Sequence, residues 1–547
     1  MLALLFIPLY ILLYPHATIA DSSTVSLAYG TFQGFISGNI TRFLGVPFAQ
    51  AGRFERPKEP ATLQTAYNAT SFGPACPQQA LSPIPGLVAT TYPSVSEDCL
   101  SLNVFRPSVT DPSVGLPVFV WIYGGGFQVG NSRDYDLTPV VERSIERGEP
   151  IMVVTLNYRL TALGFLAGKE VAAAGISNLG LRDQIFGLQW VQKYISAFGG
   201  DPDQVVVGGV SAGSVSTAYL TLNNNQNSNT LFRGIFLQSG PAQHVPSLSD
   251  GQADYDNLVA AANCTASPDT LDCLRHAPLD TVMAAVNATP NFFSYQSVNL
   301  VWGPRIDGDV IARDAWVSIS EGLHGKMPKM MGVCDDEGTI FSFSTLNITT
   351  NQEFLAYVHL NYLPKTSSAQ MAELARLYPQ DPTQGPHSAQ AQLTNSRTPQ
   401  YKRLAAFQGD LLMTSPRRFW MAHASLTQNV WGWLNKMGKF ANGDIGAYHT
   451  SDTPIWFTTT DGTDGMDALP YCIPVNFINT LDPNSPPNGS DSNSSIIWPK
   501  WNTPSSSGPS SLFTFNDDGI NITADTFRTE AVDFLNDLRL TELNNGS

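Results

Sequence analysis

The sequence has few basic residues and no cluster of them. Its 547 residues include 30 Lys and Arg against 46 Asp and Glu, which gives a net charge of −16 and a pI near 4.8. A surface that binds nucleic acid or an anionic membrane needs the opposite balance, because both attract Lys and Arg. The composition therefore predicts neither partner, and it favours a soluble protein in an acidic extracellular setting.

Long apolar runs are absent after the first residues. The run over 2–14 leads to Thr18-Ile19-Ala20, a small-residue sequence typical of a signal-peptide cleavage site. Residues 1–20 are therefore predicted to be a secretory signal peptide, and their apolar run is short for a membrane anchor. The polar C-terminus disfavours a GPI-type tail, so no stable membrane insertion is expected.

Cysteine is scarce, and the six residues present fit an oxidising compartment. Each disulfide would stabilise the chain by about 2–3 kcal/mol. Two are expected: Cys76–Cys99 and Cys264–Cys273. Cys334 and Cys472 either form a third pair or stay buried thiols. Nine N-x-S/T sequons, outside the clearest strand segments, support the secretory route. They begin at Asn39, Asn68, Asn263, Asn287, Asn347, Asn488, Asn493, Asn521 and Asn545.

Clusters of His and Cys with metal-ligand spacing are also missing, so no metal or organic cofactor is expected. The chain has no internal repeat and no linker long enough to separate two domains. Residues 21–547 are therefore predicted to form one domain, as large α/β folds with insertions do.

A strand–turn–helix signal surrounds Ser211. A β-branched run ends at Gly209-Val210-Ser211-Ala212-Gly213, and a helix-compatible stretch follows to Leu222. A G-x-S-x-G nucleophile elbow requires this context, because its tight turn exposes the serine hydroxyl. The glycines avoid a clash between strand and helix. The motif alone is common by chance, and it gains weight from its surroundings.

A glycine-rich segment follows another predicted strand. Residues 117–123 form a continuous apolar run, as in a strand buried on both faces, and lead directly into Gly124-Gly125-Gly126. Alone, these glycines could be a flexible turn. Upstream of an elbow, their N–H groups are expected to form one half of an oxyanion hole, while the N-terminus of the helix after Ser211 supplies the other.

Strand and helix patterns alternate along the chain, which predicts βαβ units in a mainly parallel sheet. Further strands are expected at 151–157, 233–238 and 329–333. Residues 183–198 have the pattern of an amphipathic helix. Three other segments have distinct patterns: a hairpin at 25–34, an exposed glycosylated loop at 484–511 and a C-terminal helix at 525–540.

Nine segments occur in a fixed order, at 43–49, 96–103, 121–127, 157–159, 178–184, 198–202, 238–240, 336–338 and 446–449. Together they resemble the type-B carboxylesterase/lipase family, which includes fungal lipases, carboxylesterases and cholinesterases. The resemblance covers nearly the whole mature chain. It implies an α/β-hydrolase fold, with a large, mostly parallel central sheet, helices on both faces and a small N-terminal antiparallel sheet.

The resemblance implies a Ser–Glu–His triad, with Ser211 as the nucleophile, Glu337 as the acid and His449 as the base. It also implies oxyanion donors from the backbone N–H groups of Gly125, Gly126 and Ala212. Asp335 and Asp336 compete with Glu337 as the acid. Three other histidines follow the acid segment, in helical or loop contexts: His359, His387 and His423.

The chain departs from the family pattern at a few places. Val210 stands where members often carry Glu before the nucleophile. The loop between Cys76 and Cys99 lacks a Trp for a choline site, which disfavours cholinesterase activity. The same loop is short for a large lid, which favours an esterase over a lipase. Arg53 and Glu97 are expected to form a structural ion pair.

These observations predict a secreted, glycosylated serine carboxylesterase that cleaves small-molecule esters through an acyl-enzyme. Two alternatives are an interfacial triacylglycerol lipase and an enzyme that tailors an ester in a secondary-metabolite pathway. A non-enzymatic, cholinesterase-like binding protein is disfavoured, because such proteins lose the nucleophile. The acyl and alcohol preferences and the oligomeric state do not follow from the sequence.

Overall fold

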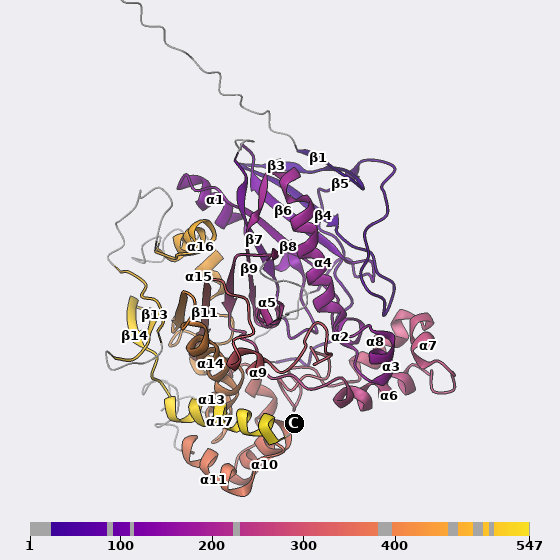
Figure 1. The fold of residues 1–547 in the computed structure, drawn as a ribbon. Coiled ribbons are helices and arrows are strands. Elements are labelled where there is room, and N and C mark those ends of the chain that lie inside the picture. Colours follow the sequence, from indigo (N-terminus) through magenta and orange to yellow (C-terminus); the bar gives the residue numbers. More distant parts are fainter. Residues whose placement is uncertain are drawn as a thin grey trace, which may run out of the picture.

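A sheet of eleven strands forms the centre of the part of the chain that the structure describes (Figure 1). This structure is a computed structural model, and it describes residues 23–84, 91–109, 114–222, 230–380, 397–457, 469–484, 496–502 and 508–545. The strand order is β14-β13-β12-β11-β10-β9-β7-β8-β6-β4-β3. The bounds are β3 (Phe35–Ser37), β4 (Ile40–Pro47), β6 (Ser101–Pro107), β7 (Leu116–Ile122), β8 (Met152–Leu156), β9 (Gly200–Val210), β10 (Gly234–Gln238), β11 (Lys329–Cys334), β12 (Val430–Asn435), β13 (Ser511–Asn516) and β14 (Gly519–Ala524).

The interior of the sheet is parallel and its edges are antiparallel. Every pairing from β13 through to β8 is parallel. The pairings of β14 with β13, and of β6 with β8, β4 with β6 and β3 with β4, are antiparallel. The predicted mostly parallel sheet is therefore confirmed. Its parallel strands bring their carboxyl ends to one edge, where ligands bind in open α/β sheets.

Alternate residues of the central strands face two different hydrophobic layers. On β7, Val118, Val120 and Ile122 pack with α4 (Leu179–Tyr194) and α5 (Ala212–Leu222). Phe119 and Trp121 pack on the opposite face, in a cluster with residues of α1 (Thr138–Glu146) and α16 (Leu469–Thr480). Figure 1 shows α1 and α16 on one side of the sheet and α4 on the other. A strand covered on both faces needs apolar residues throughout, which explains the continuous run over 117–123.

The small N-terminal sheet is mixed, not antiparallel as predicted. Strands β1 (Thr24–Leu27) and β2 (Gly30–Gln33) form the predicted antiparallel hairpin. The third strand, β5 (Tyr67–Asn68), pairs with β2 in parallel. A short hairpin turn imposes antiparallel pairing, whereas β5 joins the sheet after a long excursion of the chain and can enter in either direction.

The other helices lie around the sheet and beyond its edges. Their bounds are α2 (Thr161–Phe165), α3 (Lys169–Ala174), α6 (Gln252–Ala261), α7 (Thr270–His276), α8 (Leu279–Asn287), α9 (Ala315–Ser320), α10 (Asn351–Asn361), α11 (Ser368–Leu377), α13 (Tyr401–Gly409), α14 (Ser415–Ala424), α15 (Thr453–Phe457) and α17 (Thr529–Asn545). A π-helical turn, Asp410–Thr414, joins α13 to α14. No described helix is both long and apolar enough to cross a bilayer.

Some element boundaries differ from the prediction. The helix expected at 183–198 begins at Leu179, and its last turn from Ile195 is a 3-10 helix. The C-terminal helix begins at Thr529, because the φ angle of Arg528 is +50°, outside the right-handed helical region. Asp525 lies before the helix, where it is buried and accepts hydrogen bonds from two arginines. Part of the expected exposed loop at 484–511 is also buried, since Trp498 is only 2% exposed.

Both expected disulfides are present, Cys76–Cys99 and Cys264–Cys273. Cys334 and Cys472 are both buried and are not joined to each other in a disulfide. The predicted ion pair also forms: Arg53 Nη2 lies 2.6 Å from Glu97 Oε2.

Six sequon asparagines are exposed, namely Asn39, Asn68, Asn263, Asn287, Asn347 and Asn521. Two of them lie in strands that were not predicted: Asn68 in β5 and Asn521 in β14. Both strands are at sheet edges, where every second side chain faces solvent. Asn488, Asn493, the side chain of Asn545 and the expected signal peptide 1–20 lie outside the described residues.

Candidate active site

Ser211 occupies a strained turn between β9 and α5. Its φ angle is +54°, in the left-handed region that non-glycine residues rarely adopt. The Ser211 N–H donates to the carbonyl of Gln238 at the end of β10, at 2.9 Å, which holds the turn against the neighbouring strand. The sharp reversal leaves the hydroxyl half-buried instead of packed in the sheet. Such strain is typical of functional turns.

The flanking glycines are required for two different reasons. A Cβ atom at Gly209 would lie 2.5 Å from the carbonyl carbon of Gly213, so the strand-to-helix clash predicted from the sequence is present there. A Cβ atom at Gly213 would instead lie 2.1 Å from the carbonyl oxygen of Ile122 and 2.5 Å from that of Tyr123. Gly213 therefore lets α5 approach the end of β7, which carries the glycine-rich loop.

A hydrogen-bonded chain connects Ser211, His449 and Glu337. His449 Nε2 lies 2.8 Å from Ser211 Oγ, and His449 Nδ1 lies 2.5 Å from Glu337 Oε2. The other carboxylate oxygen of Glu337 accepts from Ser239 Oγ and from the Cys334 N–H, both at 2.7 Å. Both His449 and Glu337 are buried, so the chain is largely shielded from solvent. This arrangement can move a proton from the serine to the imidazole.

The acids that competed with Glu337 have other partners. Asp335 is bonded to the Lys439 ammonium. Asp336 Oδ2 accepts from the Ala447 N–H at 2.9 Å and lies 3.6 Å from Lys439 Nζ. The structure therefore directs Glu337, and neither aspartate, toward His449.

The alternative histidines lie elsewhere. His359 Nδ1 lies 3.2 Å from the hydroxyl of Thr366, and His423 Nδ1 lies 2.8 Å from the carbonyl of Phe419. His387 is outside the described residues.

A buried carboxylate behind the site had no predicted role. Asp452 is fully buried, and it accepts from Gln238 Nε2 at 2.7 Å, Trp433 Nε1 at 2.9 Å and Cys334 Sγ at 3.3 Å. Burial raises the pKa of Asp452, while the bonds from Trp433 and Gln238 act in the opposite direction. Burial also raises the pKa of the Cys334 thiol.

Asp452 and Ser239 connect the strand ends that carry the site. Gln238 ends β10 and Ser239 follows it, Cys334 ends β11, and Asp452 comes three residues after His449. The sequence analysis assigned no role to Ser239, although the segment 238–240 is among those that resemble the family and could have indicated it. No local pattern indicated Asp452.

Ser211 faces a cavity of about 200 Å³. Gly125, Gly126, Ala212 and His449 line it as well, so the structure brings the predicted oxyanion residues to one cavity with Ser211 and His449. Two larger cavities adjoin it. One, of about 600 Å³, shares Val215 and Leu412 with it; the other, of about 880 Å³, shares Gly125 and Thr450. Val210 is fully buried in the hydrophobic layer on the face of α1 and α16.

Comparison with known proteins identifies the family. A model of the carboxylesterase family matches residues 21–527. "Lipase 4" of Diutina rugosa is 35% identical, over 95% of this chain and 96% of the relative. "Secreted lipase 1" of Botryotinia fuckeliana (strain B05.10) is 34% identical, over 94% of this chain and 92% of the relative. The crystal structure of Aspergillus niger EstA has a TM-score of 0.81 at 27% identity, and covers 95% of this chain and 99% of that one. The chain therefore belongs to the carboxylesterase family and is a carboxylic ester hydrolase with an α/β-hydrolase fold.

Proposed function

We propose that this protein is a secreted serine carboxylesterase in which Ser211, His449 and Glu337 form the catalytic triad. The observation that carries the proposal is the continuous hydrogen-bonded chain from Glu337 Oε2 through both nitrogens of His449 to Ser211 Oγ. The same three roles recur in hydrolases that form an acyl-enzyme.

In the first step, His449 Nε2 takes the proton of Ser211 while Oγ attacks the ester carbonyl carbon. The carbonyl oxygen becomes an oxyanion, which the N–H groups of Gly125, Gly126 and Ala212 stabilise. Glu337 accepts from His449 Nδ1, which fixes the imidazole tautomer and stabilises the imidazolium that forms.

In the second step, the imidazolium gives its proton to the leaving alcohol, and an acyl-enzyme remains on Ser211. Water activated by His449 then attacks the acyl carbon and releases the acid. Because His449 protonates the alcohol, the alcohol half lies on the side of Tyr448 and Thr450, which line the 880 Å³ cavity. The acyl half then extends to the opposite side, into the 600 Å³ cavity lined by Val215 and Leu412.

Secretion and glycosylation are part of the proposal. The apolar start of the chain, the two disulfides and six exposed sequon asparagines support it. "Secreted lipase 1" and "Secreted triacylglycerol lipase LIP1" of Gibberella zeae are similar proteins whose names state the same location. We expect the mature chain to act as one domain.

A triacylglycerol lipase is the second candidate, because several similar proteins are named lipases and one of them is named a triacylglycerol lipase. A lipase would act best on long-chain emulsions, with a rise in rate once the substrate exceeds its solubility. A short-chain optimum without such a rise would support the esterase.

Hydrolysis of p-nitrophenyl esters from acetate to palmitate, by the wild type and Ser211→Ala, tests the proposal. Loss of the nucleophile lowers kcat by about 10⁶ in serine hydrolases. A fluorophosphonate probe should label the wild type at Ser211 and leave the variant unlabelled. A wild type that is inert on every ester and unlabelled by the probe would overturn the triad.

A further inference from the structure

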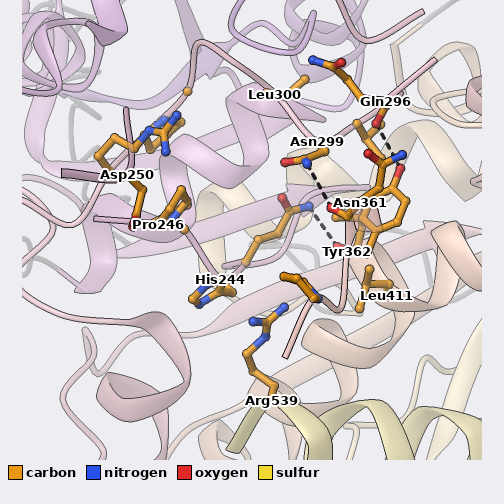
Figure 2. Close-up of a pocket in the computed structure, with 18 of the residues that line it drawn as sticks. His244, Pro246, Asp250, Gln296, Asn299, Leu300, Asn361, Tyr362, Leu411 and Arg539 are labelled. Atoms are coloured by element: carbon orange, nitrogen blue, oxygen red, sulfur yellow. Dashed lines mark hydrogen bonds between the residues drawn. The ribbon is translucent and has the colours of Figure 1, made fainter. Parts of the chain in front are cut away.

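The 600 Å³ cavity beside the Ser211 cavity, here called the acyl chamber, has a partly polar wall. Val215, Leu412 and Phe127 line both spaces, so an acyl group on Ser211 can enter it. Figure 2 shows Asn299 and His244 among its lining, and Arg539 extending from α17 towards His244. Pure hydrocarbon would desolvate such side chains without replacing their hydrogen bonds to water.

Two of the ionisable side chains in this wall are paired within the protein. His244 Nδ1 lies 2.5 Å from Asp314 Oδ2. Arg539 Nη1 donates to Glu542 Oε2 at 2.8 Å. His244 and Arg539 therefore already have partners of opposite charge type within the protein and do not require one from a ligand.

Arg305 differs from them. It is 6% exposed, and Nη2 donates to the Val301 carbonyl at 3.0 Å, while the buried Nε has no acceptor. Within the described part of the chain, no carboxylate oxygen lies within 4 Å of its guanidinium nitrogens. The Asn178 side chain fixes the backbone of Arg305. Its Oδ1 accepts from the Arg305 N–H at 2.9 Å, and its Nδ2 donates to the Arg305 carbonyl at 2.8 Å. A guanidinium has five N–H donors, so most of this buried cation's donors lack a protein acceptor.

Asp254 is the complementary group. It is half-buried, lines the acyl chamber and accepts no hydrogen bond from any described residue. Burial raises the pKa of Asp254, and the charge of Arg305 acts in the opposite direction. Burial lowers the pKa of Arg305, and Asp254 and Asp250 oppose that change. Both groups line the chamber, and each one's charge shifts the pKa of the other although they form no ion pair within 4 Å.

Arg305 and Asp254 distinguish three kinds of acyl group. An alkyl group would leave Arg305 desolvated and unpaired. A carboxylate would pair with Arg305 but would be repelled by Asp254 and by Asp250 at the rim. A hydroxyl is neutral, accepts from a guanidinium and donates to a carboxylate, so it can form a hydrogen bond with each of the two side chains.

We infer that the acyl chamber selects acids that carry a hydroxyl group, which accepts a hydrogen bond from Arg305 and donates one to Asp254. This inference rests on the proposed function, because it requires the acyl group to be on Ser211. Arg305 and Asp254 would then be specificity-determining residues, whereas Ser211, His449 and Glu337 perform the reaction.

The test compares kcat/KM for a set of p-nitrophenyl esters. The acyl groups are octanoate, ω-hydroxyoctanoate, analogues whose hydroxyl is moved along the chain, and the ω-carboxylate. A hydrogen bond to a charged group contributes about 1.5–3 kcal/mol, so kcat/KM for the best hydroxylated ester should exceed that for octanoate by about tenfold or more. Arg305→Leu should reduce this ratio about tenfold, and Arg305→Lys should restore part of it.

Arg313→Gln is the matched control, since Arg313 is exposed, pairs with Glu321 and does not line the chamber. In this variant, the ratio of kcat/KM for the hydroxylated ester to that for octanoate should equal the wild-type ratio. Should Arg305→Leu fail to fold, Asp254→Asn provides a second test. Removal of the Asp254 charge should raise kcat/KM for the ω-carboxylate ester several-fold relative to that for octanoate.

The outcomes separate the inference from the proposed function. Hydrolysis of octanoate and probe labelling of Ser211, without preference for any hydroxylated ester, would overturn the inference and leave the triad intact. An unchanged ratio in folded Arg305→Leu would do the same. If no ester is hydrolysed and Ser211 is unlabelled, both fail.

Discussion

The Nε2 atom of His449 lies 2.8 Å from the Oγ atom of Ser211, although 238 positions separate the two residues. Backbone pairing brings the loops together. Ser211 is tied to the end of β10 through the Gln238 carbonyl. The loop before His449 forms a parallel bridge between Tyr448 and Asp336, next to Glu337. His449 is therefore fixed to the loop of Glu337, and both residues are positioned against the turn of Ser211.

Replacement of Glu337 by Gln should lower kcat by about 10⁴, the loss typical of a triad whose acid becomes an amide. The amide no longer stabilises the imidazolium and favours the wrong tautomer of His449. Steady-state hydrolysis of p-nitrophenyl butyrate measures the effect. Glu321→Gln, at an exposed glutamate paired with Arg313, serves as the control and should behave as the wild type. Near-normal turnover in Glu337→Gln would rule out its role as the triad acid.

Asp452→Ala should destabilise the fold by about 3 kcal/mol or more, because it leaves the buried donors of Gln238 and Trp433 unpaired. Asp452→Asn keeps one acceptor oxygen and should lose less stability than Asp452→Ala. Urea unfolding, with the change in midpoint at constant slope, reports the difference. Equal midpoints for the wild type and the alanine variant would show that this network contributes no stability.

Gly213→Ala should destabilise the protein by about 3 kcal/mol, because the new methyl group would overlap the carbonyl oxygens of Ile122 and Tyr123. Gly303→Ala is the control, since a Cβ atom there would meet no atom closer than 3.9 Å. Thermal unfolding of both variants provides the measurement. A Gly213→Ala midpoint as high as that of the control would contradict the steric explanation.

Acid should weaken the fold through Asp525. Burial alone would raise the pKa of this carboxyl, but the guanidinium groups of Arg417 and Arg418 lower it to about 2. Because the folded pKa lies below the unfolded value of about 3.9, the stabilisation is complete above pH 4 and is lost as pH falls toward 2. The expected contribution is about 2–3 kcal/mol.

Urea unfolding at several pH values between 5 and 2 measures this loss. Asp525→Asn should be less stable than the wild type at pH 5, and the difference between them should shrink as pH falls. A difference that stays constant over this range would show that Asp525 is not the titrating group.

Sequence patterns predicted the elements whose signals are local. The apolar run over 117–123 is β7, and the glycine spacing around Ser211 marks the turn after β9. The strands β12, β13 and β14 were missed. The hairpin of β13 and β14 did have a signal, since Asp518-Gly519 lies between two alternating segments. Residues 484–511 were predicted to be exposed from their Pro, Ser and Asn content, which outweighed the aromatic Trp498 and Trp501, both buried.

The sequence by itself determined the family, the fold class and the turn that carries Ser211, because ordered motifs that contain glycine constrain the backbone locally. Only the tertiary structure decided which of Asp335, Asp336 and Glu337 approaches His449, because adjacent side chains leave a loop in different directions. It alone joined Asp452 to Gln238 and, among the described residues, gave Arg305 no carboxylate within 4 Å. Those relationships depend on contacts between distant segments, and the burial and pairing of a charged group are properties of its packed surroundings, not of its neighbours in sequence.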